Sequence, residues 1–412
     1  MTKVKAFRAW RPAAGNAEKI AALPYDVMSS DEARVMVKDK PLSFLHVDKA
    51  EIDLDPSVNI YDDAVYEKAR TNLMELKSSG SMKKDEKDCY YIYRLTMDGR
   101  AQTGIVACPS VDDYQKDIIK KHELTRADKE ADRIRHVDTL DANTGPIFLT
   151  HRPDTELSAI TKEWMAGHGG IFSFTSDSIK HEGWIVDDEA TIEKIASCFK
   201  RIPALYIADG HHRCASAVRV AEKRRAANPT YTGDEEFNYF LAVIFPSDEL
   251  TIFDYNRVVK DLNGLSEAEF FDKIRASFDV EKAEGVVKPK VKHEFGLFIN
   301  GAWHRLRAKG GIWNDKDPVE RLDVSILQNH LLSPILGIDD PRTNKRVDFV
   351  GGIRGLGELE KRVKKDMAVA LSMYPTTLDD LMDIADSGKI MPPKSTWFEP
   401  KLLSGLFIHD LK

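Results

Sequence analysis

Residues 204–215 read ALYIADGHHRCA and give the clearest local structural signal in the chain. The apolar run Ala204–Ala208 predicts a short buried strand, Asp209-Gly210 a sharp turn, and His212–Ala227 a helix. Glycine permits a close backbone approach at such a turn. The first amides of a helix have no partner within it, so an anion such as phosphate can bind there. The stretch therefore predicts a strand, a turn and a helix, with an anion-binding site at the turn.

Strands and helices alternate on both sides of this turn. Strands are expected at Ser43–Val47, Cys89–Leu95, Gly104–Cys108, Pro146–Thr150, Phe240–Phe245, Thr251–Val259, Phe295–Ile299 and Trp303–Leu306. Helices are expected at Asp62–Lys77, from about Thr125 to Leu140, and at Ala190–Lys200, Ser266–Phe278, Glu320–Leu332 and Thr377–Ser387. Turn signals at Asp98-Gly99 and Asn300-Gly301 predict two hairpins. Because no run of one element type occurs, the pattern favours a mixed α/β (α+β) architecture.

The length and charge of the chain bound its class. With 412 residues, two or three domains are expected, and the composition suits a globular protein. We expect three regions: an N-terminal α/β region at 1–105, a phosphate-binding core at 106–260, and a C-terminal α/β substrate region at 261–412. The formal net charge of -7 argues against a chain-wide nucleic-acid surface. A small-molecule substrate is therefore expected rather than nucleic acid, and a homodimer stays open.

Cellular location is predicted from what the sequence does not contain. No apolar run approaches the ~18 residues of a membrane helix. The first residues, MTKVKAFRAWRP, have no apolar segment behind them and so do not resemble a signal peptide. The 4 cysteines are far apart and form no CxxC motif, so neither a disulfide framework nor a zinc ribbon is indicated. We expect a cytoplasmic protein with no membrane partner.

The turn at residues 209–213 concentrates polar chemistry. Arg213 can bind phosphate oxygens in a bidentate way, and the two histidines that precede it add donors. Asp209 can hold a magnesium ion or orient a histidine. An ordinary strand-to-helix turn with a capping aspartate is the alternative. Several polar residues crowded around one glycine favour a functional site.

A second polar segment, Lys121-His122-Glu123-Leu124-Thr125, precedes a strongly charged helix. Glu123 stands at the helix entrance, where the helix dipole stabilises a carboxylate. A carboxylate placed there can act as a general base toward a hydroxyl group. The alternative is a solvated helix, although same-sign pairs such as Asp128 and Asp132 make a simple salt-bridge face less convincing.

Two further segments offer polar side chains. The loop 391–401 reads MPPKSTWFEPK, in which Lys394, Ser395 and Thr396 offer a cation and two hydroxyls to a small polar ligand. A C-terminal tail held by aromatic residues is the alternative explanation for this loop. Asn256 and Arg257 end a predicted strand and can be supplied to a cleft.

The ordered set formed by His122-Glu123, Asp209–Arg213 and residues 388–396, GKIMPPKST, resembles the free-serine kinases of the ParB/sulfiredoxin-like superfamily. The whole chain is similar to a bacterial group catalogued as a conserved domain of unknown function. The resemblance implies a ParB/sulfiredoxin-like nucleotide-binding core within residues 106–260. The chain differs from the compact kinases in its additional N-terminal region and in the longer separation between His122-Glu123 and the DGHHR turn.

The resemblance also implies an activity, namely phosphoryl transfer from ATP or ADP to the hydroxyl of free L-serine, which gives O-phosphoserine, with Mg²⁺ as cofactor. In that case Glu123 is the catalytic base and Asp209 acts in catalysis or magnesium binding. The nucleotide phosphates are held by Gly210, His211, His212 and Arg213. The substrate-binding residues are His122, Asn256, Arg257, Lys394, Ser395 and Thr396.

Three other functions remain open from the sequence. A nucleotide-binding ParB-like switch protein would need a helix-turn-helix and a basic surface, and neither stands out. A metal-dependent hydrolase could use His122, Glu123, His211 and His212 as ligands or bases. A sulfiredoxin-like reductase would need a reactive cysteine in the phosphate turn, whereas Cys214 lies just after it.

Overall fold

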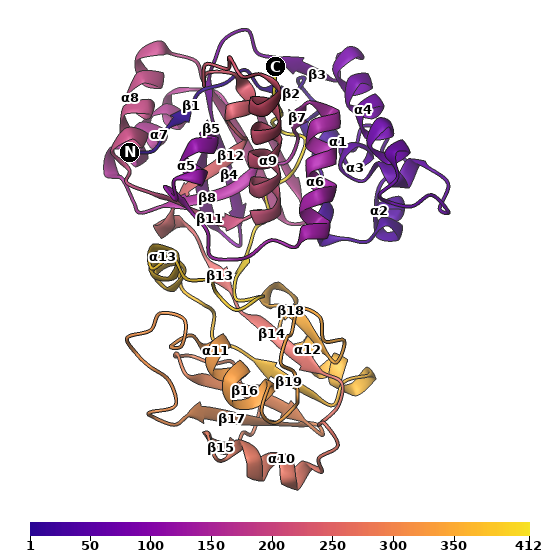
Figure 1. Ribbon diagram of the computed structural model, residues 1–412, viewed down its shortest axis with the longest axis vertical. Helices are drawn as coiled ribbons and strands as arrows, with labels where there is room; N and C mark the ends of the chain where they lie inside the picture. The colour runs from indigo at the N-terminus through magenta and orange to yellow at the C-terminus, as the bar shows by residue number, and fades with distance from the viewer. The chain divides into compact units, whose positions relative to one another are not determined.

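The computed structural model describes all 412 residues, which form two compact units (Figure 1). The first unit comprises Met1–Leu250 and Pro400–Lys412, and the second comprises Thr251–Glu399. This division differs from the three regions expected from the sequence. The expected border after residue 105 falls inside strand β5 (Arg100–Pro109), which pairs with neighbours on both sides in one sheet. Residues 1–105 therefore share a sheet with the residues that follow them.

A mixed nine-stranded sheet forms the framework of the first unit. Along the sheet the order is β6 (Ile119–Lys120), β11 (Leu205–Asp209), β8 (Ile147–His151), β12 (Ala242–Pro246), β5, β4 (Tyr90–Met97), β10 (Ile179–Val186) and β9 (Phe172–Ser176), and β1 (Val4–Lys5) also pairs with β5. The pairs β6–β11 and β8–β12 are parallel, and the other pairs are antiparallel. The expected mixed α/β class is confirmed.

The hairpin formed by β4 and β5 has the predicted turn. Met97 pairs with Arg100, so the loop consists of Asp98 and Gly99. Both have positive φ, at 51° and 77°, as in the tight turns whose twist matches a hairpin. Two residues were sufficient to predict this hairpin, because the conformation of the turn itself fixes the register of the two strands.

Helices pack their apolar sides on the sheet to form the main core. Helix α8 (Glu189–Arg201) buries Ile195, Cys198 and Phe199, and its N-cap Asp188 accepts a hydrogen bond from the Thr191 amide. Other helices of the first unit are α7 (Thr155–Gly167), α6 (Ala127–Leu140) and α9 (His211–Ala227). Strand β11 was expected to be buried, and its Leu205 and Ile207 belong to this main core.

A mostly helical subdomain precedes the first long strand. It contains α1 (Ala17–Ile20), α2 (Ser30–Met36), α3 (Leu45–Asp48) and α4 (Asp63–Ser78). The strand expected at Ser43–Val47 is wrong, because these residues run into helix α3. A short apolar run does not distinguish a buried strand from a buried helix. Here Phe44, Leu45 and Val47 are all buried in one cluster with residues of α4, and that tertiary packing selects the helix.

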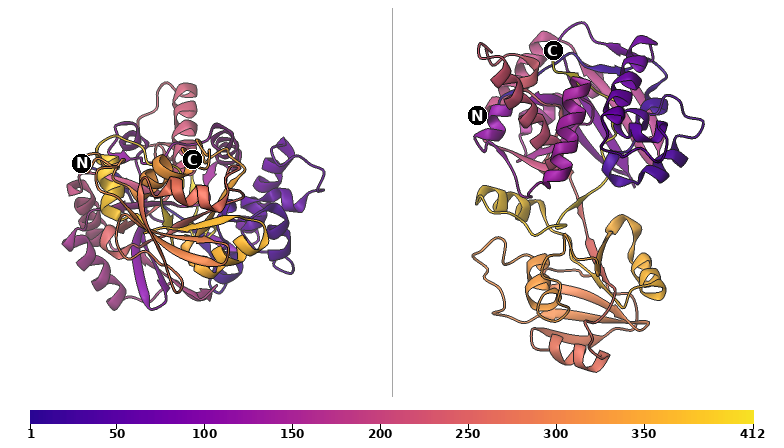
Figure 2. Two further views of the ribbon diagram at one scale, coloured as in Figure 1. Left: turned by 90° about the horizontal axis from the view of Figure 1, so that it is seen from below. Right: turned by 45° about the vertical axis from the view of Figure 1, so that its right-hand side comes forward.

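Helices α6 and α9 lie side by side (Figures 1 and 2). Ion pairs join them: Lys223 to Asp138 at 2.6 Å, and Arg224 to Asp138 at 3.2 Å. Arg224 also reaches Asp141, at the end of α6, at 2.5 Å. Asp138 and Asp141 therefore find their cationic partners on another helix, which sequence spacing alone does not reveal.

The second unit is built on a six-stranded antiparallel sheet. Its order is β15 (Phe278–Lys282), β17 (Ala302–Ala308), β16 (Glu294–Ile299), β19 (Val369–Ser372), β14 (Tyr255–Val259) and β18 (Val347–Gly351). Its main helices are α10 (Glu267–Ile274), α12 (Leu356–Lys365) and α13 (Leu378–Asp386). The Asn300-Gly301 hairpin is confirmed, since Ile299 pairs with Ala302. The long helix expected at Glu320–Leu332 is wrong in part, because α11 covers only Asp323–Leu327 and a π-helical turn follows.

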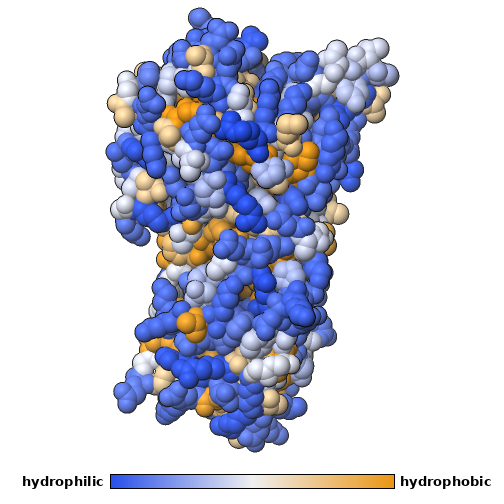
Figure 3. All heavy atoms as spheres, turned by 90° about the vertical axis from the view of Figure 1, so that its left-hand side faces the viewer, coloured by the Kyte–Doolittle hydropathy of each residue, from blue (hydrophilic) through white to orange (hydrophobic).

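None of the helices is both long enough and apolar enough to span a membrane. The face drawn in Figure 3 is mostly hydrophilic, and apolar side chains interrupt it in several places.

His181 on β10 provides a test of the buried polar core. It is 1% exposed and contacts the Tyr93 hydroxyl at 2.7 Å, and burial lowers its pKa to about 4. Between pH 6.5 and 4 the unfolded chain therefore takes up a proton that the folded chain refuses. The free energy of unfolding should fall as the pH falls through this window, by ~1.4 kcal/mol per pH unit from this group.

Urea unfolding of the wild type and of His181→Gln at several pH values measures this effect. The variant should lose less stability than the wild type between pH 6.5 and 5. Parallel pH profiles for the two proteins would contradict the assignment of a neutral buried His181.

Candidate active site

The pairing of β6 with β11 brings the two polar segments together. These strands are adjacent and parallel, with Ile119 opposite Leu205 and Lys120 opposite Tyr206. Their carboxyl ends therefore lie at the same edge of the sheet, which is where open α/β sheets commonly bind ligands. His122-Glu123 follows one strand, and Asp209-Gly210 follows the other. Two segments that are far apart in the sequence thus form one site.

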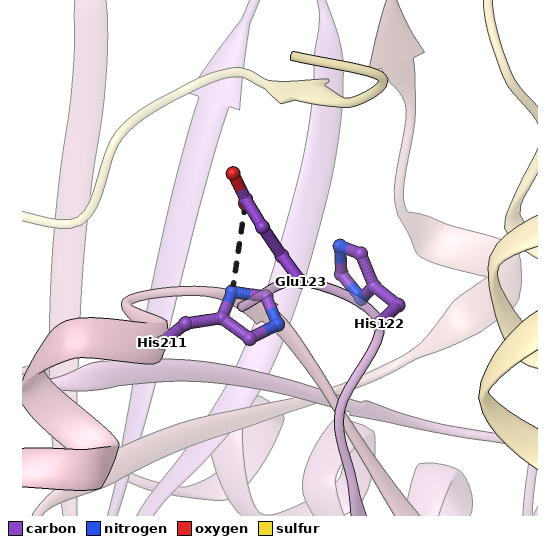
Figure 4. A group of neighbouring side chains, drawn as sticks. All are labelled: His122, Glu123 and His211. Carbon is purple, nitrogen blue, oxygen red and sulfur yellow. Dashed lines mark ion pairs between the residues drawn. The ribbon is translucent and has the colours of Figure 1, made fainter. Parts of the chain in front are cut away.

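The side chains of His122, Glu123 and His211 form a tight cluster (Figure 4). The rings of His122 and His211 meet edge to face, with centroids 4.5 Å apart. The Glu123 carboxylate lies 3.9 Å from Nδ1 of His211, which is too long for a hydrogen bond. Burial holds the pKa of His211 well below its usual range, and the neighbouring His122 lowers it further. At neutral pH the imidazole in this contact is therefore uncharged.

The turn at Gly210 has the geometry of an anion cradle. Gly210 is the N-cap of α9 with φ 93° and ψ 32°, a left-handed conformation that favours glycine. No side chain caps this end of the helix, and its first turn contains no acidic residue. The free amides and the helix dipole at the start of this 17-residue helix favour an anion.

Asp209 is held by cationic neighbours. Its Oδ1 accepts a hydrogen bond from the Gly210 amide at 2.9 Å, and its Oδ2 lies 3.3 Å from Nζ of Lys401 and 3.9 Å from Nη2 of Arg213. Burial alone would raise the pKa of this carboxyl, but the charges of Lys401 and Arg213 outweigh burial and hold it below its usual range. Asp209 is therefore an anion whose main effect is to position two cations beside the turn.

Lys401 is a site residue that sequence reasoning missed. It is the last residue of the loop 391–401, in which the sequence predicts Lys394, Ser395 and Thr396 as the ligand-binding residues. Residues 400–412 return to the first unit, and strand β21 (His409–Asp410) there pairs with β7 (Ala142–Asn143). That return brings Lys401 to Asp209. No local sequence signal indicates it.

Arg213 folds back over the turn from the first turn of α9. Its Nη1 donates to the carbonyl of Pro146, and a Cβ at Gly210 would lie only 3.0 Å from its guanidinium. The guanidinium is therefore fixed beside the start of α9.

One ring nitrogen of His212 is used within the chain. Its Nε2 accepts a hydrogen bond from the Arg126 backbone amide at 3.0 Å, which joins the start of α9 to the loop that carries Glu123. Arg126 is the N-cap residue of α6, and no side chain caps that helix. The hydroxyl of Thr125, the preceding residue, donates to Glu130 at 2.7 Å.

The site offers one set of metal ligands. Ligand atoms of His122, Glu123 and His211 lie within 4.8 Å of one another. Both ring nitrogens of His122 and Nε2 of His211 are buried with no hydrogen-bonding partner. Burial lowers the pKa of His122 to about 4, so its ring is neutral and able to coordinate a transition metal. Asp209 is poorly suited to bind Mg²⁺, because its two oxygens already face the Gly210 amide and the cations of Lys401 and Arg213.

The other predicted substrate residues belong to the second unit and are mostly buried there. Asn256 is 0% exposed and accepts a hydrogen bond from the Met373 amide. Arg257 is 4% exposed and donates to the carbonyls of Tyr255 and Lys394. Burial lowers the pKa of Arg257 to about 10. Nδ2 of Asn256 also donates to the Asp254 carboxylate, so the polar atoms of Asn256 and Arg257 find partners within the second unit.

In the loop 394–396, fewer side chains are accessible to a ligand than the sequence predicts. The Ser395 hydroxyl is buried and donates to the carbonyl of Pro392 at 2.6 Å. Lys394 is exposed, with its ammonium 5.7 Å from the ring centroid of Tyr255, and Thr396 is half-buried. Lys394 and Thr396 are therefore the members of this loop that a ligand can reach.

Several solved structures are similar to this chain at a low level. A free serine kinase in complex with AMP matches with 12% identity and a TM-score of 0.37, over 72% of this chain and 86% of that chain. A conserved hypothetical protein from Pyrococcus furiosus matches with 14% identity and a TM-score of 0.35, over 73% and 92%. SbnI with C-terminal truncation from Staphylococcus aureus matches with 9% identity and a TM-score of 0.37, over 72% and 85%.

Comparison with protein sequences gives a clearer assignment. No curated protein matches the chain at a significant level. The model of one family, described as "Protein of unknown function (DUF1015)", matches residues 4–325 and so covers most of the chain, including the whole cluster at His122, Glu123 and Asp209–Arg213. The expected similarity to a group catalogued as a domain of unknown function is thereby confirmed. The chain belongs to the DUF1015 family.

Proposed function

We propose that this protein is a small-molecule kinase that transfers a phosphoryl group from ATP or ADP to the hydroxyl of free L-serine. One observation carries the proposal: the Glu123 carboxylate lies 3.9 Å from His211, the first residue of the helix whose N-terminus forms the anion cradle. Phosphoryl transfer depends on positioning and charge neutralisation. A base beside an anion site supports that chemistry. The ordered motifs that resemble free-serine kinases support the choice of acceptor and a ParB/sulfiredoxin-like core.

Each proposed step uses a residue of the described site. Glu123, whose side chain is 41% exposed, takes the proton from the acceptor hydroxyl. The acceptor oxygen forms a bond to the terminal phosphorus, and the bond from that phosphorus to the bridging oxygen breaks. ADP leaves when the donor is ATP, and AMP leaves when the donor is ADP. The amides after Gly210, together with Arg213 and Lys401, stabilise the charge on the transferred group.

Magnesium enters this scheme with the nucleotide, as part of the substrate. Asp209 offers no oxygen that is free of a hydrogen-bonding or cationic partner. We therefore derive no step through a magnesium ion bound to Asp209. Its carboxylate orients Lys401 and Arg213 instead.

The test is a transfer assay with purified protein, Mg²⁺, ATP or ADP, and a panel of hydroxylated amino acids. We expect O-phosphoserine to form from L-serine, and no product from L-alanine, which lacks the hydroxyl. Nucleotide binding without transfer to any acceptor would reject the kinase and indicate a nucleotide-binding switch protein.

A metal-dependent hydrolase is the second candidate, and the His122–Glu123–His211 cluster is the observation that favours it. Two imidazoles and a carboxylate are a donor set that suits zinc and similar metals. Metal analysis of the purified protein separates the two functions. A stoichiometric transition metal that resists dialysis would favour the hydrolase. In that case the hydrolytic activity should be lost on chelation, and Mg²⁺ should not restore it.

A further inference from the structure

A polar cavity lies in the first unit, among α3, α4, α6 and the segment that starts at Tyr25. Its volume is about 190 Å³. Pockets for drug-sized ligands are larger, at roughly 300–1,000 Å³. The cavity is therefore of the size of a small metabolite and too small for a nucleotide.

Charges of both signs line this cavity. The cationic side chains are Lys49, Lys129 and Arg133, and the anionic ones are Asp26, Asp48, Glu51 and Asp132. Buried charges are unfavourable unless they have partners. Lys49 and Glu51 form an ion pair at 3.1 Å. The remaining groups are two cations, Lys129 and Arg133, and three carboxylates, a mixture that matches a ligand which itself carries both charges.

Arg133 is held in one orientation with part of its guanidinium free. Nε and Nη2 both lie 2.9 Å from Oδ2 of Asp132, and the Tyr66 hydroxyl holds Oδ1 of Asp132 at 2.8 Å. The guanidinium also stacks over the Tyr25 ring, 4.0 Å from its centroid. Nη1 of Arg133 has no partner within the protein. A fixed guanidinium with a free donor is suited to bind a carboxylate.

Carboxylates provide the complementary charge. Asp48 is 6% exposed, and the Thr144 hydroxyl donates to its Oδ1 at 3.0 Å, so the carboxylate is fixed in place. Asp26 makes no hydrogen bond or ion pair within the chain. Both residues line the cavity. An ammonium group would find two acceptors there, one of them fully oriented.

The cavity shares lining residues with a smaller space that Arg213 borders. A second, smaller space of about 30 Å³ is lined by Tyr25, Asp48 and Arg133, and also by Arg213 of the DGHHR turn. The same three residues thus face the polar cavity and the arginine that borders the anion cradle. A small molecule in the cavity would lie beside the turn that is proposed to hold phosphate.

We propose that this cavity is the acceptor site, and that it binds a small amino acid in its zwitterionic form. The carboxylate of the ligand binds Nη1 of Arg133, and its ammonium binds Asp48 and Asp26. The role of the ligand as acceptor rests on the proposed kinase function, whereas its binding does not. The substrate class then follows from the cavity: molecules of about the size of serine that carry both charges.

Binding of unreacted ligands to the full chain, measured by calorimetry without nucleotide, tests the proposal. L-serine and L-alanine should both bind, because both carry the two charges. L-serine methyl ester, which lacks the carboxylate, and 3-hydroxypropanoate, which lacks the ammonium, should each bind at least tenfold more weakly. Equal binding of the ester, or no binding of either amino acid, would overturn the proposal.

Variants locate the binding in this cavity. Arg133→Lys and Asp48→Asn should each raise the Kd for L-serine at least tenfold. Arg11→Lys is the matched control, since Arg11 and Asp85 are paired at 2.8 Å with side-chain exposures of 10% and 9%, the same as Arg133 and Asp132. Equal losses in Arg11→Lys and Arg133→Lys would reject the site. Circular dichroism checks that each variant is folded.

The outcomes separate this proposal from the kinase function. Serine binding that depends on Arg133, in a protein that transfers no phosphate, would support the cavity and reject the kinase. Phosphorylation of serine with the same KM in wild type and Arg133→Lys would reject the cavity and support the kinase.

Discussion

Glu123→Gln is expected to lower kcat for phosphoryl transfer by about 10²–10⁴-fold, the usual contribution of a general base. The amide has nearly the shape of the carboxylate but cannot accept the proton of the attacking hydroxyl. Glu123 precedes α6 and does not belong to the DGHHR turn, so the Kd for ATP should change by less than about threefold. Steady-state kinetics and nucleotide titration measure both quantities.

The matched control for this variant is Glu193→Gln, which removes an exposed carboxylate from α8 of the same unit. It should retain wild-type kcat and Kd. If Glu123→Gln keeps wild-type turnover, the base has been assigned to the wrong residue. If kcat and nucleotide affinity fall together, Glu123 contributes to binding instead of proton transfer.

Arg213→Ala is expected to raise the Kd for ATP by about ten- to a hundredfold, the equivalent of the ~1.5–3 kcal/mol of a hydrogen bond to a charged group. The variant removes a fixed guanidinium that lies beside the amides of the anion cradle. It also removes a cation that stabilises the Asp209 carboxylate. Titration with ATP and ADP, with a stability measurement beside it, determines the effect.

Two further variants serve as comparisons for Arg213→Ala. Arg219→Ala removes an exposed arginine from the same helix, where it pairs with Glu130 and Glu222, and nucleotide affinity should remain unchanged. Arg213→Lys keeps the charge but loses the planar fork, so it should bind ATP with intermediate affinity. Unchanged affinity in Arg213→Ala would show that phosphate is held elsewhere.

Local signals predicted much of the fold. Strand β11, the glycine turn and helix α9 follow from consecutive residues, because apolar strand residues, a positive-φ glycine and a helical pattern each act within a few positions. The Asp98-Gly99 hairpin was predictable for the same reason. Ser43–Val47 was not, since an apolar run of that length suits either a strand or a helix, and packing against α4 selects between them.

The candidate site was predicted in part. The sequence indicated Glu123 and the residues of the DGHHR turn, whose types suit an acid–base step and phosphate binding. It placed Asn256 and Arg257 among substrate-binding residues, although both side chains are buried and make hydrogen bonds within the second unit. Polarity in a sequence indicates that a side chain needs partners, but it does not indicate whether those partners are protein or ligand.

By itself, the sequence determined the mixed α/β class, the strand–turn–helix unit at Asp209–Arg213 and a carboxylate at a helix entrance. Only the tertiary structure decided that β6 and β11 are parallel neighbours, which brings Glu123 to His211, and that the C-terminal segment returns to place Lys401 beside Asp209. It also assembled the charged cavity around Arg133. The physical reason is that turns and helix ends depend on neighbouring residues, whereas strand pairing and buried charge pairs depend on the packing of the whole unit.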